Sequence, residues 1–386
     1  MANEIRDIRI EIEQSTLDDL QARLANARFP DKETVDPEIE GAWDQGIPLD
    51  YVQSLANYWQ NEYDWRRCEA ELNEFPHHML EIDGVDIHFM HVRSKHENAR
   101  PLLLTHGWPG SVIEFLKVIA PLTDPESHGG TSRQAYHLVI PSLPGYGFSG
   151  KPTKTGWSIE HVAECWDELM LTLGYGRYFA QGGDWGAMVT AAIGAQDKGH
   201  CAAIHLNMVV AMPPPAEVMS APTEQEQAVF ARLGWYQEKD NGYAMIQKTR
   251  PQTIGYGLAD SPVGQMAWIV EKLHGWSDCD GDPENIYSKD EMLDNVMLYW
   301  LNNCAASSAR LYWHSFGAPG ADLVHIPMGG SIFPMEIIGA SRRWADVRFK
   351  NIKYWNEPKK GGHFAAMEQP ELFVSELRSC FAEMSL

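Results

Sequence analysis

The sequence predicts an α/β fold: a mostly parallel, doubly wound sheet with a helical lid and an N-terminal helical extension. Three observations predict it. Short apolar runs alternate with amphipathic helical stretches between residues 101 and 206, as in a parallel sheet whose crossovers are helices. A glycine turn at 182–186 joins a strand to a helix within this alternation. From the proline run at 213–215 to about residue 322, the sequence becomes helical and rich in aromatics, as a lid over an apolar pocket requires.

Composition and charge narrow the class of protein. The chain has 386 residues, of which 31 are lysine or arginine and 53 are aspartate or glutamate, so its formal charge is −22. This charge disfavours binding to nucleic acid or to an anionic membrane. No signal-peptide pattern opens the chain, and no stretch reaches the roughly 18 apolar residues of a membrane span. We expect a cytoplasmic protein without nucleic-acid or membrane partners, either monomeric or a homodimer.

Residues 1–78 are expected to form an N-terminal extension that packs on the core. Ser15 is a candidate N-cap, and leucines at positions 17, 20 and 24 share one face of the helix that would follow. A second helix is expected from Pro48, because apolar residues recur at helical spacing as far as Trp59. Charged residues rather than a glycine- or serine-rich linker follow this helix.

The core is expected in two parts, residues 79–210 and 323–386, separated by the helical lid over residues 211–322. Asp83-Gly84 lies between two strand-like runs, which is a strong hairpin signal. Strands are expected at 79–82, 85–92, 101–105, 137–140, 177–181, 203–206, 323–327 and 352–355. Helices are expected after residue 111, over 158–173, from residue 185 and from residue 370.

The glycine turn has the pattern G-x-nucleophile-x-G. A strand precedes it and a helix of small and apolar residues follows, which is the arrangement of the nucleophile elbow in α/β-hydrolases. Gly182 and Gly186 are needed because a Cβ at either position would clash with the neighbouring backbone. The central residue is Asp184, where an esterase has serine.

A carboxylate at the elbow determines the chemistry. Serine attacks acyl carbons, whereas aspartate attacks an alkyl carbon and forms an ester whose carbonyl belongs to the enzyme. Water can then hydrolyse that ester if a base activates it and N–H donors stabilise the tetrahedral intermediate. The substrate must therefore carry an alkyl leaving group, as an epoxide or a haloalkane does. An epoxide oxygen needs proton donors such as tyrosines, and a halide needs N–H donors from Trp or Asn.

Further positions complete the predicted machinery. His363 comes late in the chain, as the nucleophile–acid–histidine order of this fold requires, and is the candidate base. Glu336 is its candidate acid partner, because it follows a predicted strand. The alternatives for this acid are Asp322, Asp346 and Glu357. The backbone N–H groups of Trp108 and Trp185 are the candidate oxyanion hole, since Trp108 follows a strand end and Trp185 follows the nucleophile.

Patterns that suggest a bound phosphate or metal have simpler interpretations. Residues 145–150 match G-x-G-x-x-G, but the next helix begins only near Ser158, so no helix N-terminus would meet a phosphate. His88 and His91 lie three apart in a strand, on opposite faces, and are interpreted as solvated. The six cysteines are scattered without a C-x-x-C pair, so reduced thiols are expected. We expect no metal and no cofactor.

These motifs resemble those of the epoxide hydrolases of the microsomal type, over almost the whole chain. The resemblance rests on the N-terminal extension and on the motifs at 106–111, 182–186, 333–336 and 361–368. It implies a hydrolase that acts on an ether bond, adding water to a small apolar epoxide to give a vicinal diol, with a role in detoxification. It assigns Asp184 as the nucleophile, His363 as the base and Glu336 as the acid that orients the base.

The same resemblance assigns two lid tyrosines, Tyr243 and Tyr312, as donors to the epoxide oxygen. Unlike the animal members of the family, the protein is expected to have no N-terminal membrane anchor. A haloalkane dehalogenase is the alternative, because it shares the fold, the aspartate elbow and the tryptophan that follows; the tyrosine pair argues against it. A non-catalytic protein of this fold would be expected to have lost a member of the triad, and none is missing.

Overall fold

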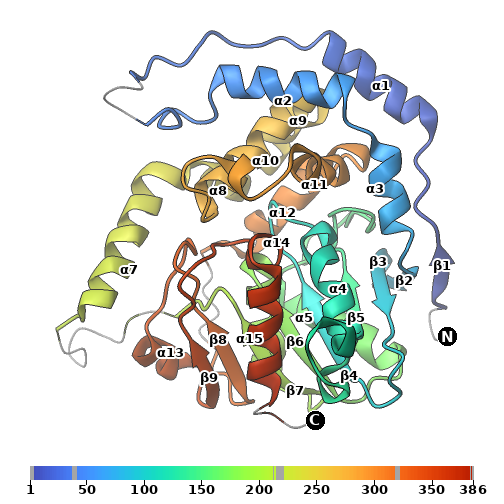
Figure 1. The fold of residues 1–386 in the computed structure, drawn as a ribbon, viewed down its shortest axis with the longest axis vertical. Helices are drawn as coiled ribbons and strands as arrows, with labels where there is room; N and C mark the ends of the chain where they lie inside the picture. Colours follow the sequence, from blue (N-terminus) through green and yellow to red (C-terminus); the bar gives the residue numbers. More distant parts are fainter. Residues whose placement is uncertain are drawn as a thin grey trace.

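The computed structural model describes residues 4–36, 41–211, 213, 221–317, 322–382 and 384. One large sheet with helices packed against it forms the lower part of the molecule in Figure 1, and a layer of helices lies above it. The predicted α/β fold with a helical lid and an N-terminal extension is thereby confirmed. In the described part of the chain, no helix combines the length and the apolar content that crossing a membrane requires.

The sheet has nine strands among the described residues, in the order β1-β2-β3-β5-β4-β6-β7-β8-β9. The pairs β1–β2, β2–β3 and β3–β5 are antiparallel, and every pair from β5 to β9 is parallel. The strands are β1 (Arg6–Ile8), β2 (His77–Ile82), β3 (Val85–Val92), β4 (Arg100–Thr105), β5 (Tyr136–Pro141), β6 (Tyr178–Gly182), β7 (Cys201–Leu206), β8 (Met328–Ser331) and β9 (Ile352–Asn356). The central strands are buried along their length because helices cover both faces.

Two strands differ from the prediction. The run at 323–327 makes only an isolated bridge, from Val324 to Phe349, and strand β8 begins at Met328, so the predicted strand is wrong. Hydropathy missed β8 because its sequence is Met-Gly-Gly-Ser, and glycine is a weak strand former. Packing requires the glycine, since a Cβ on Gly329 would lie 2.2 Å from Cys380 Sγ in helix α15 (Pro370–Ala382). Strand β1, at the sheet edge, was not predicted.

Helices pack on both faces of the sheet. α4 (Leu116–Thr123) contacts α15, and α5 (Ile159–Thr172) contacts α6 (Asp184–Gln196). The chain crosses from β4 to β5 in one direction and from β5 to β6 in the other, so right-handed crossovers place α4 and α5 on opposite faces. Ser158 occupies the N-cap position of α5 as predicted, although its hydroxyl donates to Glu160 rather than accepting from the helix backbone.

The lid lies above the carboxyl ends of the parallel strands. Its helices are α7 (Glu224–Trp235), α8 (Gly242–Thr249), α9 (Pro251–Asp260), α10 (Pro262–Trp276), α11 (Lys289–Leu301) and α12 (Ala305–Ser315). A π-helical turn, Tyr236–Asp240, connects α7 to α8. An ion pair between buried Glu226 of α7 and Arg343 of α13 (Arg342–Arg348) fastens the lid to the second part of the core.

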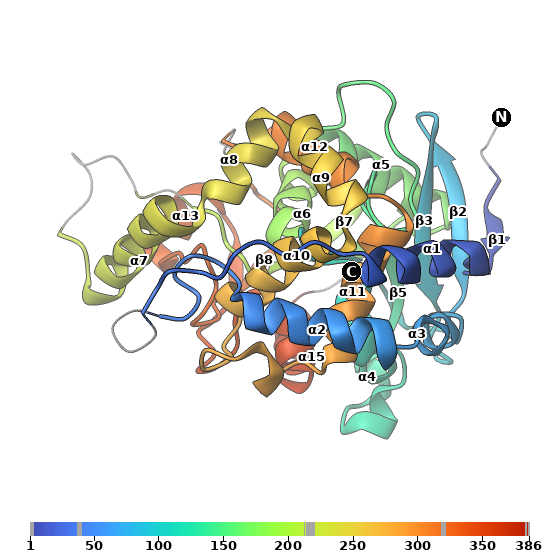
Figure 2. The same cartoon turned by 90° about the horizontal axis from the view of Figure 1, so that it is seen from above.

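The N-terminal extension packs on the lid. Its helices are α1 (Gln14–Ala25), α2 (Leu49–Asn61) and α3 (Trp65–Leu72), and Figure 2 shows α1 and α2 running over α10 and α11. Arg67 donates two hydrogen bonds, of 2.6 and 2.8 Å, to buried Asp294 of α11. The predicted N-cap at Ser15 is wrong, because the Thr16 N–H already donates to the Glu13 carbonyl and α1 begins at Gln14. The division of the chain after residues 78, 210 and 322 stays a prediction.

We expect Gly186→Ala to destabilise the protein by about 3 kcal/mol or more, because its Cβ would lie 1.9 Å from the Thr105 carbonyl oxygen. This neighbour is backbone in the middle of the sheet and cannot rotate away. Gly176→Ala is the matched control, since nothing lies within 4 Å of a Cβ built there. Denaturant unfolding measures both variants. Equal stabilities would contradict the close approach of the two backbones.

Candidate active site

The elbow places Asp184 at the first position of α6, directly after β6. Its φ is 49°, in the left-handed region where a residue other than glycine is strained. Cβ atoms on Gly182 and Gly186 would lie 2.1 and 1.9 Å from backbone oxygens, so both glycines are required for this turn, as predicted. A Cβ on Gly107 would lie 2.2 Å from Asp184 Oδ1, so the carboxylate rests against the loop that follows β4.

The two carboxylate oxygens of Asp184 have different partners. The Trp108 N–H donates to Oδ1 at 2.8 Å. His363 Nε2 lies 3.3 Å from Oδ2. The carboxylate is therefore oriented, with one oxygen on a backbone donor and the other beside an imidazole. The Trp185 N–H lies one residue further along the same turn, and its part in the oxyanion hole stays a prediction.

His363 is buried between two carboxylates. Its Nδ1–H donates to Glu336 Oε1 at 2.7 Å, which turns Nε2 toward Asp184. Trp276 packs edge-on against the ring, with 5.0 Å between centroids. Burial by itself would lower the pKa of His363, but the carboxylates of Glu336 and Asp184 raise it well above 6.5. The two carboxylates thus favour the charged form of the imidazole.

The loop that carries Glu336 is held from the lid. Arg232 of α7 donates to the Pro334 carbonyl at 2.7 Å and also to the Met335 carbonyl. Glu336 Oε1 accepts a second hydrogen bond, at 2.7 Å, from the Ile337 N–H. The acid partner of His363 is thus positioned by a lid residue that the sequence did not identify, because an arginine on a helix face carries no local signal for such a role.

The predicted tyrosines come from separate lid helices and meet at Trp108. The Tyr243 ring, on α8, stacks on Trp108 at 4.9 Å, and the Tyr312 ring, on α12, meets it edge-on at 5.8 Å. The two tyrosine rings are 5.9 Å apart. Burial raises the pKa of both hydroxyls well above 10. Both therefore stay protonated at neutral pH and can donate hydrogen bonds.

Three residues around Tyr243 were missed in the sequence. The Tyr236 hydroxyl shares a 3.0 Å hydrogen bond with the Tyr243 hydroxyl. Lys272 lies over the Tyr243 ring, with Nζ 4.7 Å from the centroid, and forms a buried ion pair with Asp240. Tyr236 lies seven residues before Tyr243, a two-turn helical spacing that could have indicated a shared face. Lys272 and Asp240 are separated along the chain by two helices, α8 and α9, and carried no such signal.

A cavity of about 10 Å³ adjoins Asp184 and His363, close to the volume that one water needs. Gln181 lines it, and the Gln181 Oε1 atom is buried without a hydrogen-bond partner among the described residues. Glu114 lines it as well, and burial raises the pKa of this carboxyl to about 8. At neutral pH the site therefore holds a second, uncharged carboxyl group, which the sequence did not reveal.

The alternative acids do not contact His363 in the structure. Asp346 pairs with Arg342 at 3.2 Å, and Glu357 accepts from the Trp355 indole N–H at 3.2 Å, both at the surface. Asp322 lines a separate hollow beside Arg348.

Two other expectations have clear outcomes. The interpretation of His88 as solvated is wrong: it is buried, and its ring nitrogens contact Ser142 and His77 at 2.9 and 2.8 Å, because both faces of β3 are covered at this point. His91 is half-buried against Tyr175.

The loop at 145–150 supports the lid, since the Tyr146 hydroxyl donates to the Ser308 carbonyl of α12 at 3.0 Å.

Known proteins resemble this chain along nearly its whole length. The family profile described as "Epoxide hydrolase N terminus" matches residues 5–115, and the profile described as "alpha/beta hydrolase fold" matches residues 100–242. A "Putative epoxide hydrolase" of Stigmatella aurantiaca (strain DW4/3-1) is 51% identical, covering 98% of this chain and 85% of its own. "Epoxide hydrolase 1" of Sus scrofa is 33% identical, covering 97% of this chain and 88% of its own.

Solved structures of epoxide hydrolases resemble this chain in fold. The Aspergillus niger epoxide hydrolase superimposes with a TM-score of 0.87 at 32% identity, covering 99% of this chain and 97% of its own. The juvenile hormone epoxide hydrolase of the silkworm Bombyx mori gives a TM-score of 0.89 at 30% identity, covering 99% and 95%. With 99% of the chain covered, the similarity includes the lid and the extension as well as the sheet.

We expect Glu114 to make the protein less stable as pH rises. Its pKa is about 8 in the folded protein and near 4.5 when unfolded, so the folded state binds one more proton between these values. The free energy of unfolding must then fall as pH rises through this interval, and Glu114→Gln should lose less stability than wild type between about pH 5 and pH 9. The exposed Glu62→Gln serves as the control. If the free energies of unfolding of wild type and Glu114→Gln changed in parallel with pH, the raised pKa of Glu114 would be ruled out.

Proposed function

Because the chain belongs to the epoxide hydrolase family, whose members are hydrolases of the α/β-hydrolase fold, we propose that it opens an epoxide through a covalent ester on Asp184. The observation that carries the proposal is the setting of this carboxylate. It stands at the elbow between the Trp108 N–H and the His363 imidazole, and two buried tyrosines, Tyr243 and Tyr312, pack against the Trp108 ring. A carboxylate nucleophile, a base and two proton donors are the groups that addition of water to an epoxide needs.

In the first step, Asp184 attacks a carbon of the epoxide and the C–O bond of the ring breaks. Oδ2 is the attacking oxygen, because Oδ1 is already engaged by the Trp108 N–H at 2.8 Å. Tyr243 and Tyr312 donate hydrogen bonds to the epoxide oxygen, on which negative charge develops. The hydrogen bond that the Tyr243 hydroxyl shares with Tyr236 and the Lys272 ammonium group over the Tyr243 ring support Tyr243 as a donor.

In the second step, water attacks the ester carbonyl of Asp184. The carbonyl oxygen is Oδ1, so the N–H groups of Trp108 and Trp185 stabilise the oxyanion that forms there. His363, oriented by Glu336, takes a proton from the water. The small cavity beside Asp184 and His363 is a suitable place for this water, and Gln181 Oε1 offers it an acceptor.

His363 balances the protons of the two steps. The resting imidazolium owes its raised pKa to two carboxylates. Formation of the ester removes the charge of Asp184, so the ring releases its proton more readily, and the epoxide oxygen requires one. In the second step one proton of the water ends on the imidazole and the other on the departing diol oxygen. The Asp184 carboxylate and the imidazolium are thereby restored.

The rings of Trp108, Tyr243 and Tyr312 favour a small apolar epoxide, and water is the second substrate. The charge of −22 disfavours nucleic acid or an anionic membrane as a partner. We place the protein in the cytoplasm, where it would act in the detoxification of epoxides as a monomer or a homodimer. A haloalkane dehalogenase is not favoured, because two hydroxyl donors suit an oxygen leaving group.

We expect Tyr243→Phe and Tyr312→Phe each to slow formation of the ester by about a hundredfold, the typical cost of losing one oxyanion donor. Tyr236→Phe should have a smaller effect, since its hydroxyl contacts Tyr243. Tyr178→Phe is the matched control, a buried tyrosine whose hydroxyl donates to Asp167. Stopped-flow measurement of a single turnover of styrene oxide reports the rate. Normal turnover by the variant with both lid tyrosines replaced would rule out the epoxide mechanism.

We expect His363→Gln to accumulate a covalent adduct with styrene oxide, because the hydroxyls of Tyr243 and Tyr312 still donate to the epoxide oxygen during alkylation, while hydrolysis of the ester lacks its base. Glu336→Gln should accumulate less, since Glu336 acts only through His363. Intact-protein mass spectrometry detects the adduct, peptide mapping locates it, and Asp184→Asn is the control without a nucleophile. An adduct with 1-bromobutane but none with styrene oxide would favour the dehalogenase. Loss of activity without any adduct would contradict the covalent mechanism.

A further inference from the structure

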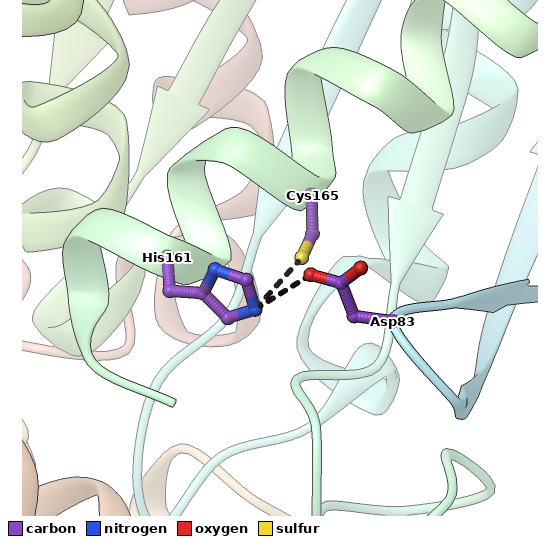
Figure 3. Close-up of side chains that lie close together, drawn as sticks. All are labelled: Asp83, His161 and Cys165. Atoms are coloured by element: carbon purple, nitrogen blue, oxygen red, sulfur yellow. Dashed lines mark hydrogen bonds and ion pairs between the residues drawn. The ribbon is translucent and has the colours of Figure 1, made fainter. Parts of the chain in front are cut away.

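Three side chains of types that bind metals, one exposed, one half-buried and one buried, lie together where the β2–β3 hairpin meets α5. Asp83 is in the hairpin turn, and His161 and Cys165 are one helical turn apart on α5 (Figure 3). Their ligand atoms all lie within 4.8 Å of one another. We propose that these three side chains bind a divalent transition-metal ion, with zinc as the preferred ion. This site is independent of the proposed catalytic function.

The spacing of the ligand atoms is close to that of a tetrahedral zinc site. Bond lengths of about 2.0 Å to N or O and about 2.3 Å to S place two ligand atoms roughly 3.3–3.5 Å apart. His161 Nε2 lies 3.2 Å from Asp83 Oδ2 and 3.9 Å from Cys165 Sγ. Figure 3 shows Nε2 directed at both the carboxylate and the thiol. Only small side-chain rotations are needed to bring all three atoms around one ion.

The donor set selects the class of ion. Thiolate and imidazole favour zinc and similar transition metals, whereas magnesium and calcium prefer sites made of oxygens alone. Three protein ligands leave the fourth position to water, and a surface hollow of about 500 Å³ opens beside them. Among the residues that line this hollow, four are acidic and one is a lysine, Lys198, so the charge of the site attracts a cation.

The surroundings of His161 support a ligand role. Its other ring nitrogen, Nδ1, lies 3.5 Å from Glu164 Oε2, so a carboxylate faces it on the side away from the proposed ion. Carboxylates in this place fix the tautomer of metal-bound histidines and strengthen their binding. Trp157 packs edge-on against the ring at 4.7 Å and restricts its rotation. A plain surface ion pair between His161 and Asp83 would require neither the second carboxylate nor the thiol.

A bound ion would connect two parts of the core. It would tie the hairpin turn at Asp83 to α5, which packs on α6, the helix that begins with Asp184. An ion that binds only the folded protein stabilises it by mass action. The motif was not visible in the sequence because Asp83 lies far from His161 along the chain, and His161 and Cys165 alone are two ligands.

Cobalt substitution tests the site. Full-length protein without a histidine tag, in a buffer free of thiols and chelators, is titrated with Co²⁺ under anaerobic conditions. We expect one equivalent to produce a thiolate-to-cobalt charge-transfer band in the near ultraviolet, and one equivalent of Zn²⁺ to abolish it. Cys165→Ala should lose the band, and His161→Ala and Asp83→Asn should weaken Co²⁺ binding at least tenfold. Cys279→Ala, which removes another buried thiol, should keep the band.

Two further readouts separate this site from the catalytic one. Zn²⁺ should raise the Tm of the wild type and leave that of His161→Ala unchanged. Turnover of styrene oxide by His161→Ala should equal that of the wild type, so loss of the metal site and loss of the proposed function can be distinguished. A charge-transfer band that survives in Cys165→Ala, or equal Co²⁺ binding by wild type and His161→Ala, would overturn the proposal.

Discussion

The close approach of two backbones at the elbow governs the rest of the site. Gly186 packs directly on the Thr105 carbonyl at the end of β4, and Gly107 leaves room for the Asp184 side chain. Because the turn and the loop after β4 are in contact, the Trp108 N–H comes within 2.8 Å of the carboxylate. A larger residue at either glycine would separate them. The strained φ of Asp184 is maintained by the same packing, which aims the carboxylate out of the sheet.

The lid provides more than a cover. It supplies both tyrosines from different helices, and it also holds the loop of Glu336 through Arg232. On the opposite side, Asn295 of α11 donates to the Pro109 carbonyl at 2.7 Å, next to Trp108. The adjacent Asp294 accepts two hydrogen bonds from Arg67 of the N-terminal extension. The extension therefore affects the site indirectly, because it fixes the helix that supports the loop of Trp108 after β4.

Local sequence predicted those parts of the site that depend on short-range geometry. The elbow, the hairpin at Asp83-Gly84 and helix α5 each follow from turn residues or from periodicity, and each is confirmed. Strand β8 was not predicted, because Gly329 is required by the packing of helix α15 against it, which hydropathy does not reveal. The interpretation of His88 as solvated was wrong for a similar reason. His88 is buried against Ser142 and His77, which come from other strands or loops. Tyr243 and Tyr312 came from the resemblance to a family and from no local pattern.

The sequence alone determined which chemistry is available, because a carboxylate between the elbow glycines is a property of five consecutive residues. It also determined the alternation of strands and helices, since apolar periodicity reflects which faces are buried. Only the tertiary structure decided the pKa values and the packing of the groups that carry out this chemistry. The raised pKa values of His363 and Glu114 and the stacking of Tyr243 on Trp108 depend on groups that are distant along the chain. Electrostatic interactions and packing act through space, and separations in space are set by the fold rather than by neighbours in sequence.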